Sequence, residues 1–140
     1  MFDKILLGFD GSEHAARAAA AAGDIARAMI SRSLLIVAAF DPLPGYLGEP
    51  NFSDIGARRT MEADRLAEMA KSEVGAISGE ITVEIVSGHA AEAILRVAEI
   101  RECDLIVLGS RGMGSFGALL LGSQCQKVLH LARCPVLVVR

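Results

Sequence analysis

The sequence contains no tryptophan, and one tyrosine and five phenylalanines are its only aromatic residues. Its net charge is −3, and the 14 lysines and arginines are scattered along the chain without forming a basic block. Proteins that bind nucleic acid through the phosphate backbone present a clustered basic patch. The composition therefore gives no indication of nucleic-acid binding.

Cysteine is also scarce. The three cysteines, Cys103, Cys125 and Cys134, are odd in number and show neither a CxxC motif nor Cys/His spacing typical of a metal site. A disulfide framework is therefore not indicated. We expect three free thiols in or near the core, as in a protein of the reducing cytoplasm.

Long hydrophobic runs are missing as well, since no apolar segment reaches the length of a membrane span. Met1 is followed almost at once by Asp3 and Lys4, which is unlike a secretory leader. Hydrophobic residues nevertheless make up 52% of the chain and charged residues 22%, a globular composition. We expect one cytoplasmic domain spanning residues 1–140, with no membrane association.

Short apolar runs alternate with segments whose apolar residues recur at helical spacing. The runs predict five strands, at Lys4–Phe9, Ser33–Phe40, Ile81–Val86, Asp104–Gly109 and Pro135–Val139. The segments between them predict four helices, with apolar stripes at Ala15–Met29, Ala63–Ile77, Ala91–Ala98 and Leu121–Ala132. Strands that alternate with helices form a mostly parallel sheet covered on both faces. The sequence thus predicts a single doubly wound α/β domain.

Two segments carry further information. Asp41–Asp54 holds three of the four prolines and predicts a surface loop, either a lid or an idle connection. Ile81–Val86 alternates apolar and polar residues, so one face of this strand is less buried, which indicates a position near a sheet edge.

A glycine-rich stretch, LGSRGMGSFGALLLGSQC (Leu108–Cys125), joins the fourth predicted strand to the last helix. In doubly wound sheets, ligands bind at the carboxyl ends of the strands, where the winding reverses. Gly109 and Asp10 each follow such a strand. Glycines admit an anion close to backbone N–H groups, and a helix start adds further N–H groups and the positive end of its dipole. The stretch predicts a phosphate cradle, to which Ser123 could add a hydroxyl and Arg111 a cation.

Alternatives remain open at this point. The residues Gly112–Gly117 match GxGxxG but follow the fourth strand, not the first, and no P-loop pattern is present. The stretch could also be a long loop without a ligand. Asp10 suits an Asx turn or helix cap as well as a ligand contact, and Arg111 could be a solvated loop residue. His14, His89 and His130 have no obvious serine or cysteine partner and are interpreted as structural or surface residues.

The combined pattern resembles the universal stress protein family. Gly109-x2-Gly112-x9-Gly122-Ser123 matches the nucleotide-binding pattern of that family, and KILLGFDGSEHA, FDPLP, DLIVLGSRG and ARCPVLVVR extend the resemblance over nearly the whole chain. The resemblance implies a five-stranded parallel sheet in the order 3-2-1-4-5, with Asp10 and Gly109 flanking the crevice. It also implies that ATP, or another adenine nucleotide, binds with Mg²⁺.

The resemblance carries over to individual residues. Members of the family place adenosine near the first and second strands, the ribose and phosphates at the loop after the fourth strand, and the phosphates at the last helix start. The matching residues are, in that order, Gly8, Asp10 and Ala39, then Leu108, Gly109, Arg111 and Gly112, then Gly122, Ser123 and Gln124. Gly8 and Ala39 depart from relatives that carry proline and valine there, and the smaller Ala39 offers the adenine less apolar contact.

The function expected from this resemblance is a nucleotide-binding regulatory module in the stress response, with no catalytic residue assigned. A slow ATPase or autophosphorylating enzyme is one alternative, for which Asp10 is the only evident base near the predicted phosphate loop. A dimeric interaction module without nucleotide is another. Pro135–Val139 is short, apolar and last in the implied strand order, so its exposed edge predicts pairing with a second copy in a homodimer.

Overall fold

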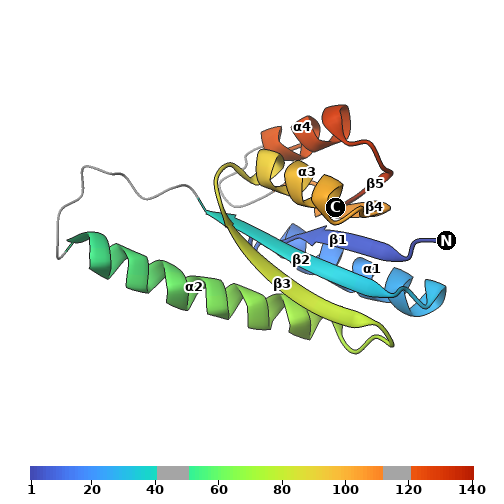
Figure 1. The fold of residues 1–140 in the computed structure, drawn as a ribbon, viewed down its shortest axis with the longest axis horizontal. Helices are drawn as coiled ribbons and strands as arrows, with labels where there is room; N and C mark the ends of the chain where they lie inside the picture. Colours follow the sequence, from blue (N-terminus) through green and yellow to red (C-terminus); the bar gives the residue numbers. More distant parts are fainter. Residues whose placement is uncertain (41–50, 112–120) are drawn as a thin grey trace.

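The structure, a computed structural model, describes residues 1–40, 51–111 and 121–140. In these residues five strands alternate with four helices (Figure 1). The strands are β1 (Lys4–Gly8), β2 (Ser33–Phe40), β3 (Glu80–Ser87), β4 (Leu105–Gly109) and β5 (Val136–Val139). The helices are α1 (Glu13–Met29), α2 (Asn51–Val74), α3 (Ala90–Ile100) and α4 (Ser123–Leu131).

β1 lies at the centre of a parallel sheet with the strand order β3-β2-β1-β4-β5. Leu7 of β1 pairs with Ile36 of β2 on one side and with Val107 of β4 on the other. The chain builds the sheet outward from β1 to β3 and then returns to add β4 and β5, so the winding reverses between β1 and β4. The doubly wound fold and the order 3-2-1-4-5 are confirmed, with β3 at one edge of the sheet.

Helices cover both faces of the sheet, α1 and α2 on one and α3 and α4 on the other (Figure 1). Along β1, Ile5 and Leu7 belong to the buried cluster beneath α1 and α2, whereas Leu6 belongs to the cluster beneath α3 and α4. All three are fully buried. Burying a side chain of this size contributes about 1.5–3 kcal/mol. Burial on both faces explains why β1 is apolar at successive positions.

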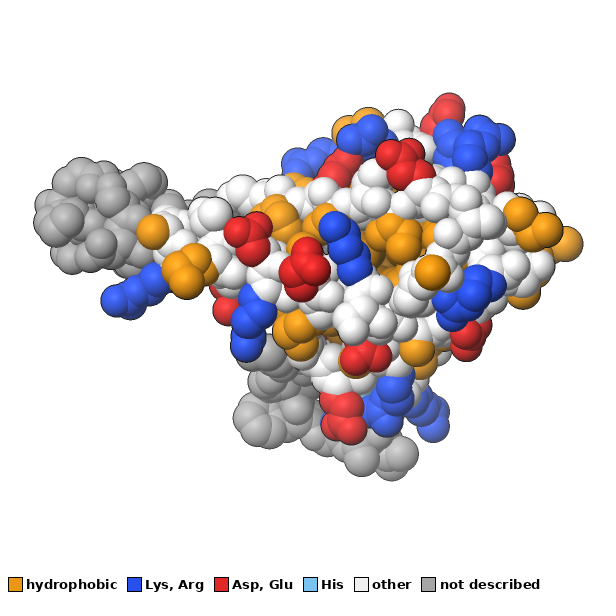
Figure 2. All heavy atoms as spheres, turned by 90° about the horizontal axis from the view of Figure 1, so that it is seen from below, with side chains coloured by type: hydrophobic (Ala, Val, Ile, Leu, Met, Phe, Trp, Pro, Cys, Tyr) orange, Lys and Arg blue, Asp and Glu red, His pale blue; other side chains and the backbone are white. Residues whose placement is uncertain are grey.

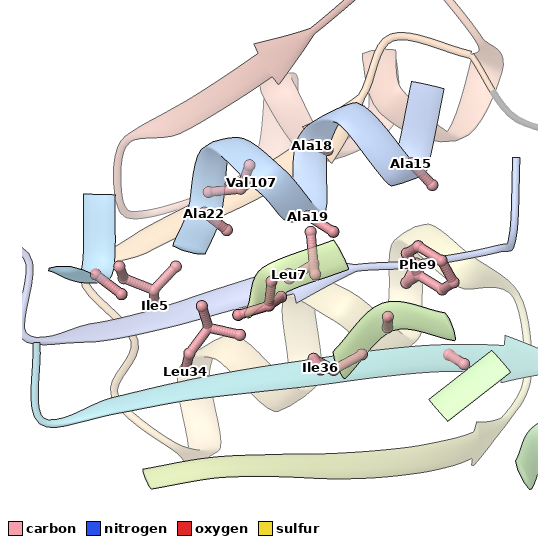
Figure 3. Close-up of a cluster of buried hydrophobic side chains, with 14 of the residues drawn as sticks. Ile5, Leu7, Phe9, Ala15, Ala18, Ala19, Ala22, Leu34, Ile36 and Val107 are labelled. Carbon is pink, nitrogen blue, oxygen red and sulfur yellow. The ribbon is translucent and has the colours of Figure 1, made fainter. Parts of the chain in front are cut away.

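Small residues bring α1 close to its neighbours. Ala15, Ala19 and Ala22 of α1 share the buried cluster of Leu7 (Figure 3). Gly23 allows a still closer approach, because a Cβ at this position would lie 2.2 Å from the main-chain oxygen at the end of α2. The alanine-rich composition of this segment therefore reflects short-range packing of α1 on the sheet and on α2.

The predicted boundaries of α2 were wrong at both ends. α2 begins at Asn51, so residues 51–54 of the predicted Asp41–Asp54 loop are helical, while residues 41–50 lie outside the described chain. α2 ends at Val74 because Gly75 takes a left-handed conformation, with φ +75°, that stops the helix. Ile77 therefore packs against the core from beyond the helix. α4 begins at Ser123 with Gly122 as its N-cap, which agrees with the predicted helix start at these two residues.

The surface carries charges of both signs. Figure 2 shows acidic and basic side chains interspersed on the underside of Figure 1. Several are paired, among them Arg27 with Asp24 at 2.8 Å and Arg101 with Glu84. Such exposed pairs contribute little to stability. None of the helices in the described part of the chain combines the length and the hydropathy that crossing a membrane requires.

Candidate functional site

A cavity of about 270 Å³ opens where the sheet reverses its winding, at the carboxyl ends of β1 and β4. Its size is close to the lower end of the range for small-molecule pockets, about 300–1,000 Å³. Nine of the ten predicted site residues line it: Gly8, Asp10, Ala39, Leu108, Gly109, Arg111, Gly122, Ser123 and Gln124. The tenth, Gly112, lies outside the described residues. The fold thus brings together residues from four separate stretches of the chain.

One wall of the cavity is apolar. Val37 and Ala39 of β2, Leu108 of β4 and Ile94 of α3 line it. Gly8 sits behind this wall, and a Cβ on residue 8 would lie 2.6 Å from Leu108 Cδ2 and 2.8 Å from Ile94 Cδ1. A side chain at position 8 would therefore displace the side chains that shape the wall. Such a wall suits a flat, weakly polar group such as a nucleobase.

A second part of the lining is the N-terminus of α4. Gly122 occupies the N-cap position, and its N–H donates to the carbonyl oxygen of Ser110 at 2.8 Å. Because glycine has no side chain, it cannot cap the first N–H groups of α4 as Ser12 caps α1 by accepting from the Ala15 N–H at 3.1 Å. Gly122, Ser123 and Gln124 all line the cavity, so this end of α4 presents a favourable environment for an anion.

Gln124 also has a structural contact. Its Oε1 accepts a hydrogen bond from the Ala91 N–H at 2.9 Å, at the first turn of α3. The N-cap residue of α3, His89, provides no side-chain cap of its own. Gln124 therefore caps a neighbouring helix while lining the cavity, a role that the family resemblance did not include.

Asp10 follows β1 at the mouth of the cavity and is exposed. Its Oδ1 accepts from the Ser12 N–H at 2.9 Å, which is the predicted Asx turn. This turn leads into the N-cap of α1. Asp10 is the only carboxylate among the described residues that line the cavity.

Gly109 is a glycine for a reason that the sequence did not reveal. A Cβ on residue 109 would lie 2.8 Å from the carbonyl carbon of His14 and 2.9 Å from the nitrogen of Ala15. The first turn of α1 thus packs directly on the end of β4. Close helix packing, rather than room for a phosphate alone, requires glycine here.

The interpretation of His14 as a residue without a serine partner was wrong. His14 Nδ1 lies 2.7 Å from Ser110 Oγ, and His14 Nε2 lies 3.2 Å from a terminal nitrogen of Arg111. His14 and Ser110 are 96 residues apart, so no local motif joins them. The available signal was topological: strands one and four adjoin in the implied order, so the segments that follow them meet.

The cysteines lie in or near the core, as predicted, and all three are free. Cys125 of α4 is buried and also lines the cavity, and burial raises the pKa of its thiol. A buried neutral thiol of this kind behaves as a small apolar group. Within residues 1–40, 51–111 and 121–140, no three His, Cys, Asp or Glu side chains are grouped as a metal site.

The fold and the position of the cavity place this protein among doubly wound α/β domains with a cavity where the winding reverses, at the carboxyl ends of β1 and β4. Comparison with known proteins narrows the class. The chain belongs to the universal stress protein family, whose model matches residues 1–140.

Individual relatives agree with this assignment. The chain is 47% identical over 140 residues to a universal stress protein of Thermus aquaticus, from the QAH/OAS sulfhydrylase 3′ region, and the match covers both chains completely. The solved structure of universal stress protein UspA from Lactobacillus plantarum has a TM-score of 0.86 at 26% identity, covering 99% of this chain and 98% of that one. A universal stress protein solved in complex with cAMP has a TM-score of 0.72 at 25% identity, covering 99% and 97%.

Proposed function

We propose that this protein binds an adenine nucleotide, with ATP as the expected ligand, in the cavity between β1 and β4. The observation that carries the proposal is that the cavity lining combines apolar residues of β2, β4 and α3 with the N-terminus of α4. The wall of Val37, Ala39 and Leu108 suits a base, and the N-terminus of α4 suits phosphates. The relative solved with cAMP supports an adenine nucleotide as the class of ligand.

The arrangement suggests a role for each lining group. Ala39, at the carboxyl end of β2, would contact the adenine, and Asp10 would meet the ribose hydroxyls. Leu108 and Gly109 would contact the ribose and phosphates. Gly122 and Ser123 would bind the phosphates through backbone N–H groups and the Ser123 hydroxyl, with Arg111 as a cation.

Mg²⁺ fits this site only together with the nucleotide. The described lining offers one carboxylate, Asp10. Mg²⁺ is usually bound by one or two carboxylates, substrate phosphates and waters. Because we place Asp10 at the ribose, we propose that Mg²⁺ enters with ATP, held by the phosphates and by waters, and that the free protein binds it weakly.

We further propose that the protein acts as a regulatory module of the stress response rather than as an enzyme. Of the two carboxylate oxygens of Asp10, Oδ1 accepts from the Ser12 N–H. We place the other at the ribose hydroxyls, so no carboxylate of the described lining remains to act as a base. An efficient phosphoryl transfer site also needs a positioned base and cations around the transferred group. Binding of the nucleotide, not its turnover, would then change the surface that a partner meets.

A homodimer through Pro135–Val139 is part of this proposal. β5 pairs with β4 on one side and ends the described sheet on the other. Leu137 of β5 is 36% exposed, and Leu129 of α4 is 40% exposed. An apolar edge strand offers unpaired main-chain groups to a second copy, and a two-fold axis would close the assembly as a dimer.

The direct test is calorimetric titration of the purified protein with ATP, ADP, AMP, cAMP and adenosine, each with and without Mg²⁺. The proposal expects one saturable site per chain, tighter for ATP than for adenosine, with Mg²⁺ strengthening only the di- and triphosphate. Arg17→Ala serves as the control for charge, because Arg17 is an exposed arginine of α1 that does not line the cavity. Equal or absent binding of all five ligands would contradict the proposal.

A further inference from the structure

His14, Ser110 and Arg111 form a connected group beside the cavity. His14 lies in the first turn of α1, and the other two residues follow β4. The ring nitrogens of His14 lie 2.7 Å from Ser110 Oγ and 3.2 Å from an Arg111 guanidinium nitrogen. Arg111 also lines the cavity, but His14 and Ser110 do not. The group therefore connects a residue of the site to residues behind it.

The chemistry of the two contacts determines where the imidazole proton lies. A guanidinium only donates hydrogen bonds, so Nε2 of His14 must accept from Arg111. A neutral imidazole with an accepting Nε2 carries its proton on Nδ1, which then donates to Ser110 Oγ. The geometry thus selects the neutral Nδ1–H tautomer of His14.

Ser110 is a fixed support for this arrangement. It is only 4% exposed. Its N–H donates to the carbonyl oxygen of Val139 at 2.7 Å, and its carbonyl oxygen accepts from the Gly122 N–H at 2.8 Å. Ser110 is therefore held by β5 and by the start of α4. Because its position is fixed on both sides, its hydroxyl can hold the His14 ring in one orientation.

We propose that His14 is a positioning residue, which holds the Arg111 guanidinium at the cavity so that it contacts the phosphates of a bound nucleotide. The inference rests on the proposed nucleotide function of the same cavity. A guanidinium carries five N–H donors, so a hydrogen bond to His14 is compatible with a contact to an anion. An arginine held in place before binding loses less side-chain entropy when the phosphate arrives.

This arrangement predicts which ligands depend on His14. Phosphate-bearing ligands should lose affinity when His14 is removed, since only they meet Arg111. Adenosine should not, because its contacts lie on the Ala39 wall and at Asp10. A purely structural role of His14 would lower the affinity for both ligands together.

The experiment compares ATP and adenosine binding by calorimetry for the wild type, His14→Ala, Arg111→Ala and the double variant. Holding one long side chain corresponds to about a 2- to 10-fold change in affinity. His14→Ala should therefore lower the affinity for ATP by this factor and leave the affinity for adenosine unchanged. It should add little to Arg111→Ala in the double variant, because both changes remove the same contact.

Two further variants distinguish the roles of the two ring nitrogens of His14. His14→Gln retains an acceptor near the position of Nε2 and should restore most of the ATP affinity. His14→Asn retains a donor only near the position of Nδ1 and should resemble His14→Ala. His130→Ala, at an exposed histidine near the end of α4, is the matched control and should bind as the wild type does.

The outcomes separate the two proposals. A wild type that binds neither ligand overturns the nucleotide function and the role of His14 with it. A wild type that prefers ATP, with full ATP affinity in His14→Ala, overturns only the role of His14. Long-range ¹H–¹⁵N NMR of the imidazole adds a readout independent of binding. It should find the proton on Nδ1, and a proton on Nε2 in the neutral ring would contradict the proposal.

Discussion

The first turn of α1 rests on the end of β4 so closely that a Cβ on Gly109 would lie 2.8 Å from the carbonyl carbon of His14. The obstacle is main chain, which cannot rotate away as a side-chain terminus can. The same contact brings His14 beside Ser110, its hydrogen-bond partner. Glycine at position 109 thus allows α1 to pack on β4 and places His14 next to the cavity.

Gly109→Ala should therefore destabilise the protein whether or not a nucleotide is present. Forcing an added methyl into a packed site costs about 1–3 kcal/mol. Urea unfolding without ligand, followed by circular dichroism, measures this cost. Unchanged stability in the variant would show that α1 is not held against β4 as the structure describes.

In contrast to Gly109→Ala, Gly122→Leu should lose ligand binding and retain the fold. Gly122 has φ −61° and ψ 151°, an ordinary extended conformation that other residues adopt without strain. A leucine there would occupy the space before the N-terminus of α4, where we place the phosphates. ATP affinity should fall at least tenfold, about 1.4 kcal/mol. Retained ATP affinity in a folded variant would mean that the phosphates bind elsewhere.

The proposed dimer depends on main-chain groups of β5 that point away from β4. The N–H groups of Ile106 and Ser110 donate to the carbonyl oxygens of Pro135 and Val139, so alternate residues of β5 face β4. Val138 lies between two such positions and directs its N–H outward. Val138→Pro removes this donor and should yield a monomer in sedimentation equilibrium, while circular dichroism stays unchanged.

Leu137→Pro is the matched comparison for the dimer, since it removes an N–H that faces β4 and should destabilise the monomer itself. A dimer that persists in Val138→Pro would place the interface elsewhere.

Cys103 gives a prediction about pH. Burial, with Cys134 as a smaller cause, raises the pKa of the Cys103 thiol from 9.0 to about 11. Between these two pKa values Cys103 keeps its proton in the folded chain and has lost it in the unfolded chain. The contribution of Cys103 to the free energy of unfolding is therefore complete below pH 9 and falls as pH rises towards 11. Because Cys103 is half-buried, solvent screening reduces the size of this effect.

The measurement compares urea unfolding at about pH 8 and about pH 10.5 for the wild type and Cys103→Ala, so that other titrating groups cancel. The wild type should lose more stability than the variant over this interval. Equal losses would contradict the raised pKa.

Much of the fold was predictable because the apolar runs and helical stripes are unambiguous. β1 and β4 are buried on both faces, and such strands are recognised as continuous apolar runs. The pairing of β1 with β4 in the sheet could not be predicted in this way. Side-chain patterns do not specify which strands pair, and only the family resemblance supplied the order. The start of α2 at Asn51 was missed because prolines and glycines nearby favour a loop.

The candidate site was predictable where its residues lie at the carboxyl ends of strands, as Gly109 does at the end of β4 and Asp10 does after β1. His14 was missed because its partners lie 96 and 97 residues away and meet it only in the folded sheet. The reason for glycine at position 109 was missed likewise, since a close approach between main chains leaves no pattern in the neighbouring residues. Contacts made between distant segments are the part that local sequence patterns do not contain.

The most direct test of the account is an NMR titration of the ¹⁵N-labelled protein with ATP, following backbone amide signals. We predict saturable shifts at Gly122, Ser123 and Gln124, where the N-terminus of α4 lines the cavity, and at Ala39 in the apolar part of the lining. Cys103 and Cys134, which line a separate cavity, serve as the internal reference and should not shift. Shifts centred on that second cavity, or no shifts at saturating ATP, would contradict nucleotide binding in the cavity at the carboxyl ends of β1 and β4.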